Sequence, residues 1–385
     1  MLELVAIDLP GGPGFVEAVQ RAWDDGNAVL PLGHHDPPSH RRRLVERLGA
    51  GAVVDAGGHH VVEGGRPVEP GDAVVIATSG STGEPKGAVL THDAVQYAAF
   101  ASATALGVDA DACWLACLPL GHVGGFSVTT RALHTGAALV VHDGFDADAV
   151  DAAPGRGATH TSLVPTAMAR IDPTRWRRIL LGGSAIPEPR PANTVATYGM
   201  TETFGGVVYD GLALNGVRVR IARDVLDDPG PRGGPDGPGP IELSSPTLLR
   251  CYRDGTVPVG PDGWYRTGDL GTIDAATGRL TVHGRADDLI ITGGEKVWPH
   301  AVEAVLEQHA AVAEAAVLGR PDPDWGQRVV ALVVPADAAR PPTLDELRAW
   351  VKDRLPAAAA PRSLEQRDHL PRTSLGKLAR RTLNS

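Results

Sequence analysis

Residues 78–87 read Thr-Ser-Gly-Ser-Thr-Gly-Glu-Pro-Lys-Gly and follow directly on the apolar run Ala73–Ala77. Small hydroxyl residues alternate with glycines, so the backbone N–H groups of this loop can turn toward an anion, and Lys86 adds a full positive charge. The Walker A loop differs, because there a lysine followed by serine or threonine opens a helix. Pro85 and Gly87 flank the lysine here and both oppose a helix at this point. The stretch predicts a phosphate-binding loop, although an ordinary Ser/Gly-rich surface loop has a similar composition.

The loop resembles the signature loop of the adenylate-forming enzymes, the superfamily of acyl-CoA synthetases, non-ribosomal adenylation domains and luciferases. In that superfamily the loop closes over the β- and γ-phosphates of ATP. The resemblance therefore implies that ATP is a ligand and that Lys86 contacts it. The resemblance also assigns ATP binding to the other residues of the loop, which are Thr78, Ser79, Gly80, Ser81, Thr82 and Gly83.

Length, charge and cysteine content restrict the class of protein. A chain of 385 residues that is 43% apolar and 21% charged is typical of a globular protein with room for two domains. The net charge of −10 disfavours a general nucleic-acid binder, which needs an excess of Lys and Arg. Three cysteines without metal-ligand spacing predict neither a disulfide framework nor a structural zinc site. The N-terminus lacks the pattern of a secretory leader, and no apolar run approaches the ~18 residues of a membrane span, so we expect a cytoplasmic protein without membrane insertion and leave a homo-oligomer open.

Short apolar runs alternate with helical patterns over most of the chain. Ala28–Leu32 is typical of a buried strand, whereas Phe15–Trp23 and Asp93–Ala105 have the composition and periodicity of helices. Residues 343–346, Thr-Leu-Asp-Glu, form a capping box that predicts a helix reaching to about Leu355. Strands that alternate with helices predict an α/β protein with mostly parallel sheets.

A second motif, Thr-Tyr-Gly-Met-Thr-Glu-Thr, occupies residues 197–203. An aromatic ring can stack on adenine, a hydroxyl can donate to a phosphate, and a carboxylate can hold a hard Mg²⁺ ion. A turn with a buried tyrosine is the purely structural alternative. The heptad resembles the Tyr-Gly-x-Thr-Glu element of the adenylate-forming enzymes. By that resemblance Tyr198 and Gly199 border the adenine, Thr201 contacts phosphate and Glu202 carries the magnesium.

Two further segments resemble the acyl-binding part of the superfamily. Cys113–Phe126 contains Leu-Pro-Leu-Gly-His followed by a Gly-rich stretch, and Ile179–Ser184 is an apolar strand that ends in glycines, where a backbone can approach a flat ligand closely. A single histidine in a turn is usually structural, but its setting here matches the superfamily. The residues that the resemblance assigns to the substrate pocket are His122, Gly125, Gly183 and Ser184.

Residues 263–269 read Gly-Trp-Tyr-Arg-Thr-Gly-Asp, which in isolation would be a turn. A carboxylate can accept two hydrogen bonds from a vicinal diol, so an acidic residue suits a ribose. The resemblance implies that Asp269 binds both ribose hydroxyls and that Arg285 contacts the nucleotide.

The resemblance also places a change of domain after these motifs. Asp287 corresponds to the hinge, so we expect a large N-terminal α/β domain that binds ATP and the acyl group over residues 1–285 and a small, mobile α+β lid over 286–385. Lys377 matches the lysine that the superfamily brings over the carboxylate and the α-phosphate, although a lysine in a terminal basic stretch is commonly just solvated. The loop that would face the pantetheine of CoA consists of Gly293, Gly294 and Glu295.

The motifs in this order imply an ATP-dependent acid:CoA ligase that acts on a small carboxylic acid in two steps, through an acyl-adenylate. Lys377, Thr201, Lys86 and Glu202 with its Mg²⁺ would stabilise the developing charge. Within the superfamily, the compact form of the chain, residues 118–125 and residues 198–211 look most like the o-succinylbenzoate:CoA ligases of menaquinone synthesis. Three alternatives stay open: another aryl- or short-chain acyl-CoA ligase, a stand-alone adenylation enzyme that loads a carrier protein, and a non-catalytic nucleotide-binding homologue.

Overall fold

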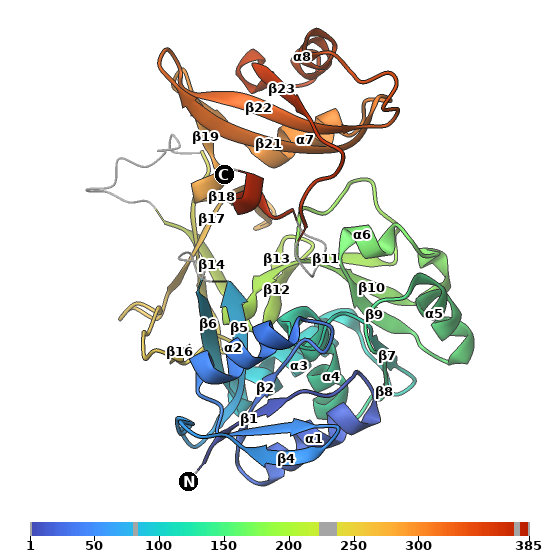
Figure 1. Cartoon of the computed structure of the whole chain (residues 1–385), viewed down its shortest axis with the longest axis vertical. Coiled ribbons are helices and arrows are strands. Elements are labelled where there is room, and N and C mark those ends of the chain that lie inside the picture. Colours follow the sequence, from blue (N-terminus) through green and yellow to red (C-terminus); the bar gives the residue numbers. More distant parts are fainter. Residues whose placement is uncertain (1, 80–83, 223–236, 373–377, 384–385) are drawn as a thin grey trace. The chain divides into compact units, whose positions relative to one another are not determined.

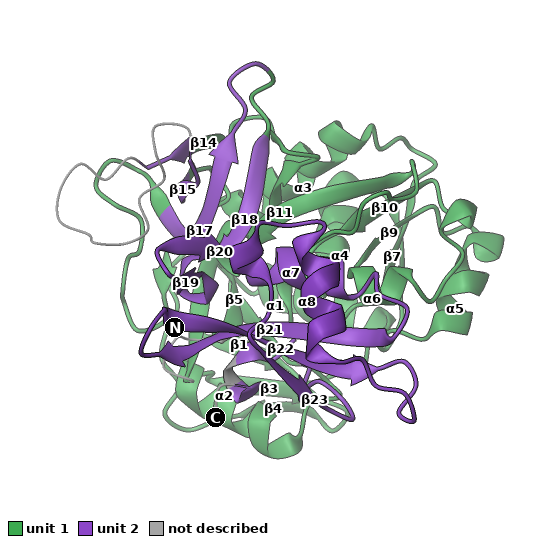
Figure 2. Ribbon diagram, turned by 90° about the horizontal axis from the view of Figure 1, so that it is seen from above, with its two compact units in different colours: residues 1–219, 243–265, 277–279 green, residues 220–242, 266–276, 280–385 purple. Residues whose placement is uncertain are grey.

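The computed structural model describes residues 2–79, 84–222, 237–372 and 378–383. The predicted site residues Gly80, Ser81, Thr82, Gly83 and Lys377 lie outside the described residues. By its internal contacts the chain divides into two compact units, which Figure 2 colours separately. Unit 1 comprises residues 1–219, 243–265 and 277–279, and unit 2 comprises residues 220–242, 266–276 and 280–385. The predicted domain boundary after residue 285 stays a prediction.

The first sheet of unit 1 has the strand order β16-β6-β5-β2-β1-β3-β4 (Figure 1). Its central strands β5, β2, β1 and β3 pair in parallel, whereas β4, β6 and β16 are antiparallel additions. The strands are β1 (Leu4–Ile7), β2 (Ala28–Pro31), β3 (Ala52–Asp55), β4 (Gly58–Val61), β5 (Asp72–Ser79), β6 (Pro85–Thr91) and β16 (Cys251–Tyr252). The helices between them are α1 (Pro13–Asp24), α2 (Pro38–Leu48) and α3 (His92–Leu106).

The second sheet of unit 1 has the order β13-β12-β11-β10-β9-β7-β8. Strands β8, β7, β9, β10 and β11 are parallel, and β12 and β13 are antiparallel. The strands are β7 (Cys113–Ala116), β8 (Ala138–Val141), β9 (His160–Leu163), β10 (Arg178–Leu181), β11 (Thr194–Met200), β12 (Gly205–Tyr209) and β13 (Leu212–Ala213). The helices are α4 (Val123–Thr135), α5 (Ala147–Ala152) and α6 (Pro165–Met168), with the 3-10 turns η1 (Ala153–Arg156), η2 (Pro173–Arg175) and η3 (Thr201–Thr203). Both sheets are therefore mixed with parallel centres, which confirms the predicted α/β class.

Helix α4 begins where the sequence indicated a Gly-rich turn, and two glycines near its start disfavour a helix. Burial overrides that preference, since every residue from Gly125 to Ala132 is buried. Gly125 is required by close packing: a Cβ atom there would lie 2.4 Å from the carbonyl oxygen of Leu118.

Unit 2 contains two smaller sheets, ordered β14-β15-β17-β18 and β20-β19-β22-β21, with β23 added parallel to β22. The strands are β14 (Arg218–Ile221), β15 (Gly239–Ser244), β17 (Tyr265–Ile273), β18 (Leu280–Arg285), β19 (Ile290–Thr292), β20 (Glu295–Val297), β21 (Val312–Asp322), β22 (Gly326–Pro335) and β23 (Ser363–Gln366). The helices are α7 (Pro299–Leu306) and α8 (Leu344–Lys352), with η4 (Ala286–Asp288), η5 (Ala357–Ala359) and η6 (Arg380–Leu383).

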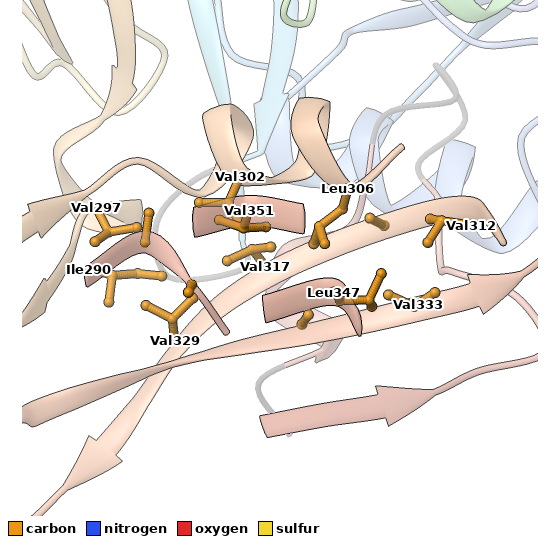
Figure 3. Packing of buried hydrophobic residues seen from close by; sticks show 14 residues of the cluster. Ile290, Val297, Val302, Leu306, Val312, Val317, Val329, Val333, Leu347 and Val351 are labelled. Carbon is orange, nitrogen blue, oxygen red and sulfur yellow. The ribbon is translucent and has the colours of Figure 1, made fainter. Parts of the chain in front are cut away.

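The core of unit 2 lies between its two helices and the β21–β22 hairpin (Figure 3). Leu306 on α7 and Leu347 on α8 are both fully buried in it, as are Val317 and Val329 on the hairpin. The predicted capping box at the start of α8 is confirmed, because the backbone N–H of Glu346 donates to the Thr343 hydroxyl while the Glu346 carboxylate accepts the backbone N–H of Thr343. The helix ends at Lys352, three residues before the predicted end.

Within the described ranges, none of the helices combines the length and the apolar character that crossing a membrane requires.

Candidate active site

The carboxyl ends of the parallel strands in the second sheet lie at one edge, where ligands of open α/β sheets bind. His122 follows β7, Gly183 and Ser184 follow β10, and Thr201 and Glu202 follow β11. The structure therefore brings residues predicted for the acyl pocket and residues predicted for phosphate and metal to the same edge of one sheet.

His122 is the N-terminal cap residue of α4 and is half-buried. Gly183 has a left-handed backbone with φ of 85°, which favours glycine, and Ser184 beside it is exposed. These three residues lie at the strand ends, and their contact with an acyl group stays a prediction.

The turn after β11 is held by tight packing and by one buried hydroxyl. A Cβ atom on Gly199 would lie 1.9 Å from the carbonyl oxygen of Gly205, so only glycine fits where β11 meets β12. The hydroxyl of Thr203, which is fully buried, donates to the same carbonyl over 2.7 Å and accepts the backbone N–H of Met200 over 3.0 Å. Thr203 was assigned no role from the sequence, yet its hydrogen bonds hold the single turn η3 that carries Glu202.

Glu202 meets a residue that sequence reasoning missed. The hydroxyl of Tyr252 donates to Oε1 of Glu202 over 2.8 Å, and Nζ of Lys86 lies 5.1 Å from the centre of the Tyr252 ring. Burial, and next the negative charge of Glu202, raise the pKa of Tyr252 well above its ordinary value, so the phenol stays protonated and is the donor. No motif contains Tyr252, and only the pairing of β16 with β6 brings it here.

Lys86 stands on a strand, whereas the sequence predicted a loop here and Pro85 and Gly87 were expected only to oppose a helix. Strands β5 and β6 pair antiparallel with Thr78 opposite Lys86, and the Thr78 hydroxyl donates to the backbone carbonyl of Lys86 over 3.4 Å. The described ends of the predicted phosphate loop are thus the two strands of a hairpin.

In unit 2 the structure pairs the two residues predicted to hold the nucleotide. Asp269 on β17 and Arg285 on β18 are directly opposite, and Nε of Arg285 lies 3.0 Å from Oδ1 of Asp269. The Arg285 guanidinium also donates to the backbone carbonyl of Thr267 over 3.1 Å. Asp269 is 8% exposed and Arg285 is mostly exposed, so the arginine orients a carboxylate that is largely withdrawn from water.

The predicted CoA-facing loop is a tight hairpin turn between β19 and β20. Gly293 and Gly294 have φ values of 59° and 84°, as a two-residue turn of the type I′ class requires. The backbone N–H of Gly293 donates to the carbonyl of Trp325 over 2.9 Å, and Glu295 is exposed. Asp287 is exposed within η4. Their roles toward CoA and in domain movement stay predictions.

Glu202 and Lys86, which are predicted to hold metal and phosphate, lie in unit 1, whereas Asp269 and Arg285, which are predicted to hold the nucleotide, lie in unit 2. The model of the AMP-binding enzyme family matches residues 56–253, and the model of the AMP-binding enzyme C-terminal domain matches residues 301–377. The chain belongs to the AMP-binding enzyme family.

The names of individual relatives are more specific than the name of the family. The chain is 39% identical over 348 residues to a probable 2-succinylbenzoate–CoA ligase from Mycobacterium tuberculosis, covering 83% of this chain and 85% of that protein. It is similar to the solved structure of o-succinylbenzoate CoA synthetase from Bacillus subtilis in complex with the acyl-adenylate intermediate OSB-AMP, with a TM-score of 0.86, 29% identity, and coverage of 100% and 88%. The same Bacillus subtilis enzyme in complex with ATP and magnesium ion matches with a TM-score of 0.84, 29% identity, and coverage of 100% and 89%. These matches confirm the predicted superfamily and its fold.

Proposed function

We propose that the chain is an ATP- and Mg²⁺-dependent 2-succinylbenzoate:CoA ligase of menaquinone synthesis. The observation that carries the proposal is the placement of Glu202 and Lys86 about Tyr252, with Glu202 at the same sheet edge as His122 and Ser184. The relatives named as 2-succinylbenzoate ligases support the choice of acid.

In the first half-reaction, a carboxylate oxygen of the acid attacks the α-phosphorus of ATP. The bond from that phosphorus to the oxygen bridging to the β-phosphate breaks, and pyrophosphate leaves with the electron pair. We assign to the ammonium of Lys86 the role of balancing charge on the departing phosphates, and to the Thr201 hydroxyl that of donating to the α-phosphate. We assign to Lys377 the role of bringing the carboxylate and the α-phosphate together.

Glu202 suits a magnesium ion. Mg²⁺ prefers oxygen ligands and is usually held by one or two carboxylates together with substrate phosphates and waters. Oε1 of Glu202 already accepts a hydrogen bond from Tyr252, so that the carboxylate is oriented before any ion arrives. When bound, the ion would neutralise part of the phosphate charge.

In the second half-reaction the thiol of CoA loses its proton and its sulfur attacks the acyl carbon. The bond between the acyl carbon and the phosphate oxygen breaks, and AMP leaves with the electron pair. We assign the AMP ribose to Asp269, with Arg285 holding the carboxylate in place. Rotation about Asp287 would bring the Gly293-Gly294 turn toward the CoA arm. Because ATP and CoA are cytoplasmic metabolites, the proposal includes a cytoplasmic site of action.

The test is mass spectrometry of the products that the purified protein forms from ATP, Mg²⁺, CoA and one acid. 2-Succinylbenzoate, benzoate and butyrate are supplied in parallel reactions, each with a matched reaction that lacks CoA. We expect 2-succinylbenzoyl-CoA and AMP from the first acid and little product from the others.

Other outcomes would identify the alternatives. If benzoate or butyrate formed thioesters at the same rate as 2-succinylbenzoate, the proposed acid would be wrong, but the ligase reaction would still hold. Acyl-AMP without thioester would indicate a carrier-protein thiol as acceptor, and no adenylate with any acid would refute the catalytic proposal.

A further inference from the structure

We propose that Tyr252 is a positioning residue that keeps the carboxylate of Glu202 and the ammonium of Lys86 in fixed places about one phenol ring. This inference rests on the proposed function, because it takes Glu202 as the metal-holding carboxylate and Lys86 as a phosphate-binding group. Tyr252 itself would touch neither the metal nor the nucleotide.

The two contacts use different parts of the ring. The hydroxyl at its tip donates to Oε1 of Glu202 over 2.8 Å, whereas the face of the ring lies 5.1 Å from Nζ of Lys86. A cation is attracted to the face of an aromatic ring, and a carboxylate accepts from a hydroxyl in the plane of the ring. The Tyr252 side chain therefore contacts two groups of opposite charge, the Glu202 carboxylate at its tip and the Lys86 ammonium at its face.

The backbone on either side of Tyr252 is hydrogen-bonded to the strand that carries Lys86 and to the turn that carries Glu202. Tyr252 and Cys251 pair with Ala88 and Val89 on β6, close to Lys86. The backbone N–H of Arg253 donates to the carbonyl of Gly87 over 2.7 Å.

On the other side, the backbone N–H of Leu249 donates to the carbonyl of Glu202 over 2.8 Å. Residues 249–253, which we call the bracket segment, are thus hydrogen-bonded to the strand that carries the lysine and to the turn that carries the carboxylate.

The bracket segment is anchored in the body of unit 1. Nε and Nη2 of Arg250 each donate over 2.9 Å to a carboxylate oxygen of Asp72, which is 2% exposed and begins β5. The guanidinium of Arg253 donates to the backbone carbonyls of Leu48 and Pro67 over 2.9 and 2.8 Å. A side chain on so firmly held a segment can set the position of its neighbours.

The hydrogen bond of 2.8 Å from the Tyr252 hydroxyl restricts the side chain of Glu202. A free glutamate side chain has several rotamers, and a metal must select one of them at an entropic cost. Tyr252 selects the rotamer beforehand and occupies Oε1, which leaves the second oxygen for a metal.

Two variants separate the two contacts. Tyr252→Phe removes the hydroxyl and keeps the ring, and Tyr252→Leu removes both. Tyr97→Phe is the matched control, because the Tyr97 hydroxyl donates over 3.2 Å to the carbonyl of Asn215 and Tyr97 has no role in the proposed site.

The measurement is binding of Mn²⁺ to the protein·ATP complex by electron paramagnetic resonance, together with calorimetric ATP binding without metal. Neither needs the acyl substrate, so a wild-type protein that fails to bind ATP would refute the proposed function rather than the role of Tyr252. Thermal unfolding of each variant is followed in the same buffer.

We expect Tyr252→Phe to weaken Mn²⁺ binding about ten-fold while metal-free ATP affinity stays within about two-fold of the wild type. We expect Tyr252→Leu to weaken metal-free ATP binding as well, because Lys86 loses its support, and Tyr97→Phe to change neither. Wild-type Mn²⁺ affinity in Tyr252→Phe would overturn the inference. Equal losses in both kinds of binding, accompanied by a lower unfolding temperature, would show a merely structural role and overturn it too.

Discussion

Replacing Arg250 by methionine should destabilise unit 1 strongly, because it leaves the buried carboxylate of Asp72 without its cation. The Asp72 side chain is 1% exposed and accepts two hydrogen bonds of 2.9 Å from the guanidinium. Breaking one partner of a buried pair costs about 3–5 kcal/mol. Arg250 also pairs with Glu69 over 2.8 Å, but Glu69 is 67% exposed, so that contact adds less than about 1 kcal/mol.

Urea unfolding followed by tryptophan fluorescence measures this loss. The indole of Trp23 donates to the backbone carbonyl of Ala73, next to Asp72, so the probe reports on the relevant strand. The double variant Asp72→Leu with Arg250→Met should recover to within about 1 kcal/mol of the wild type, because it leaves no buried charge. The double-mutant cycle, built from the wild type, the two single variants and the double variant, would then give a coupling energy between Arg250 and Asp72 of about 3 kcal/mol.

Arg177 offers a control ion pair with similar distances at the surface. Its Nη1 donates to both oxygens of Asp109 over 2.8 and 2.9 Å, but the two side chains are 46% and 56% exposed. Arg177→Met should therefore cost less than about 1 kcal/mol. If Arg250→Met costs no more than Arg177→Met, burial does not determine the strength of the Arg250–Asp72 pair, and the reasoning fails.

Three further outcomes are expected. Lys377→Ala should abolish formation of the acyl-adenylate but leave CoA transfer from supplied acyl-adenylate largely intact, and equal loss in both assays would contradict the proposed division of roles. Gly199→Ala should cost about 3 kcal/mol or prevent folding, because its Cβ would meet a carbonyl oxygen at 1.9 Å, whereas Gly124→Ala, whose Cβ has a nearest neighbour at 3.5 Å, should be tolerated in urea unfolding. Burial lowers the pKa of His160 from 6.5 to about 4, so the unfolded chain binds more protons between these values. Stability should therefore fall as pH drops from about 6.5 to 4, by up to about 3 kcal/mol, and His160→Gln should flatten that slope in pH-dependent unfolding.

Much of the fold and most of the candidate site follow from local sequence patterns. The capping box at Thr343 could be predicted because a cap involves residues only three apart. The absence of a helix at Lys86 could be predicted because proline and glycine act on their own backbone. The order of the nucleotide motifs was sufficient to identify the superfamily.

The sequence by itself therefore determined the α/β class, the family and the residues of the nucleotide motifs, since each depends on neighbours within a few positions. The tertiary structure alone decided that Tyr252 contacts Glu202, a residue 50 positions away, and that helix α4 forms despite two glycines near its start. The reason is physical: strand pairing and core burial bring distant residues together, and their free energies exceed the local preferences that a sequence displays.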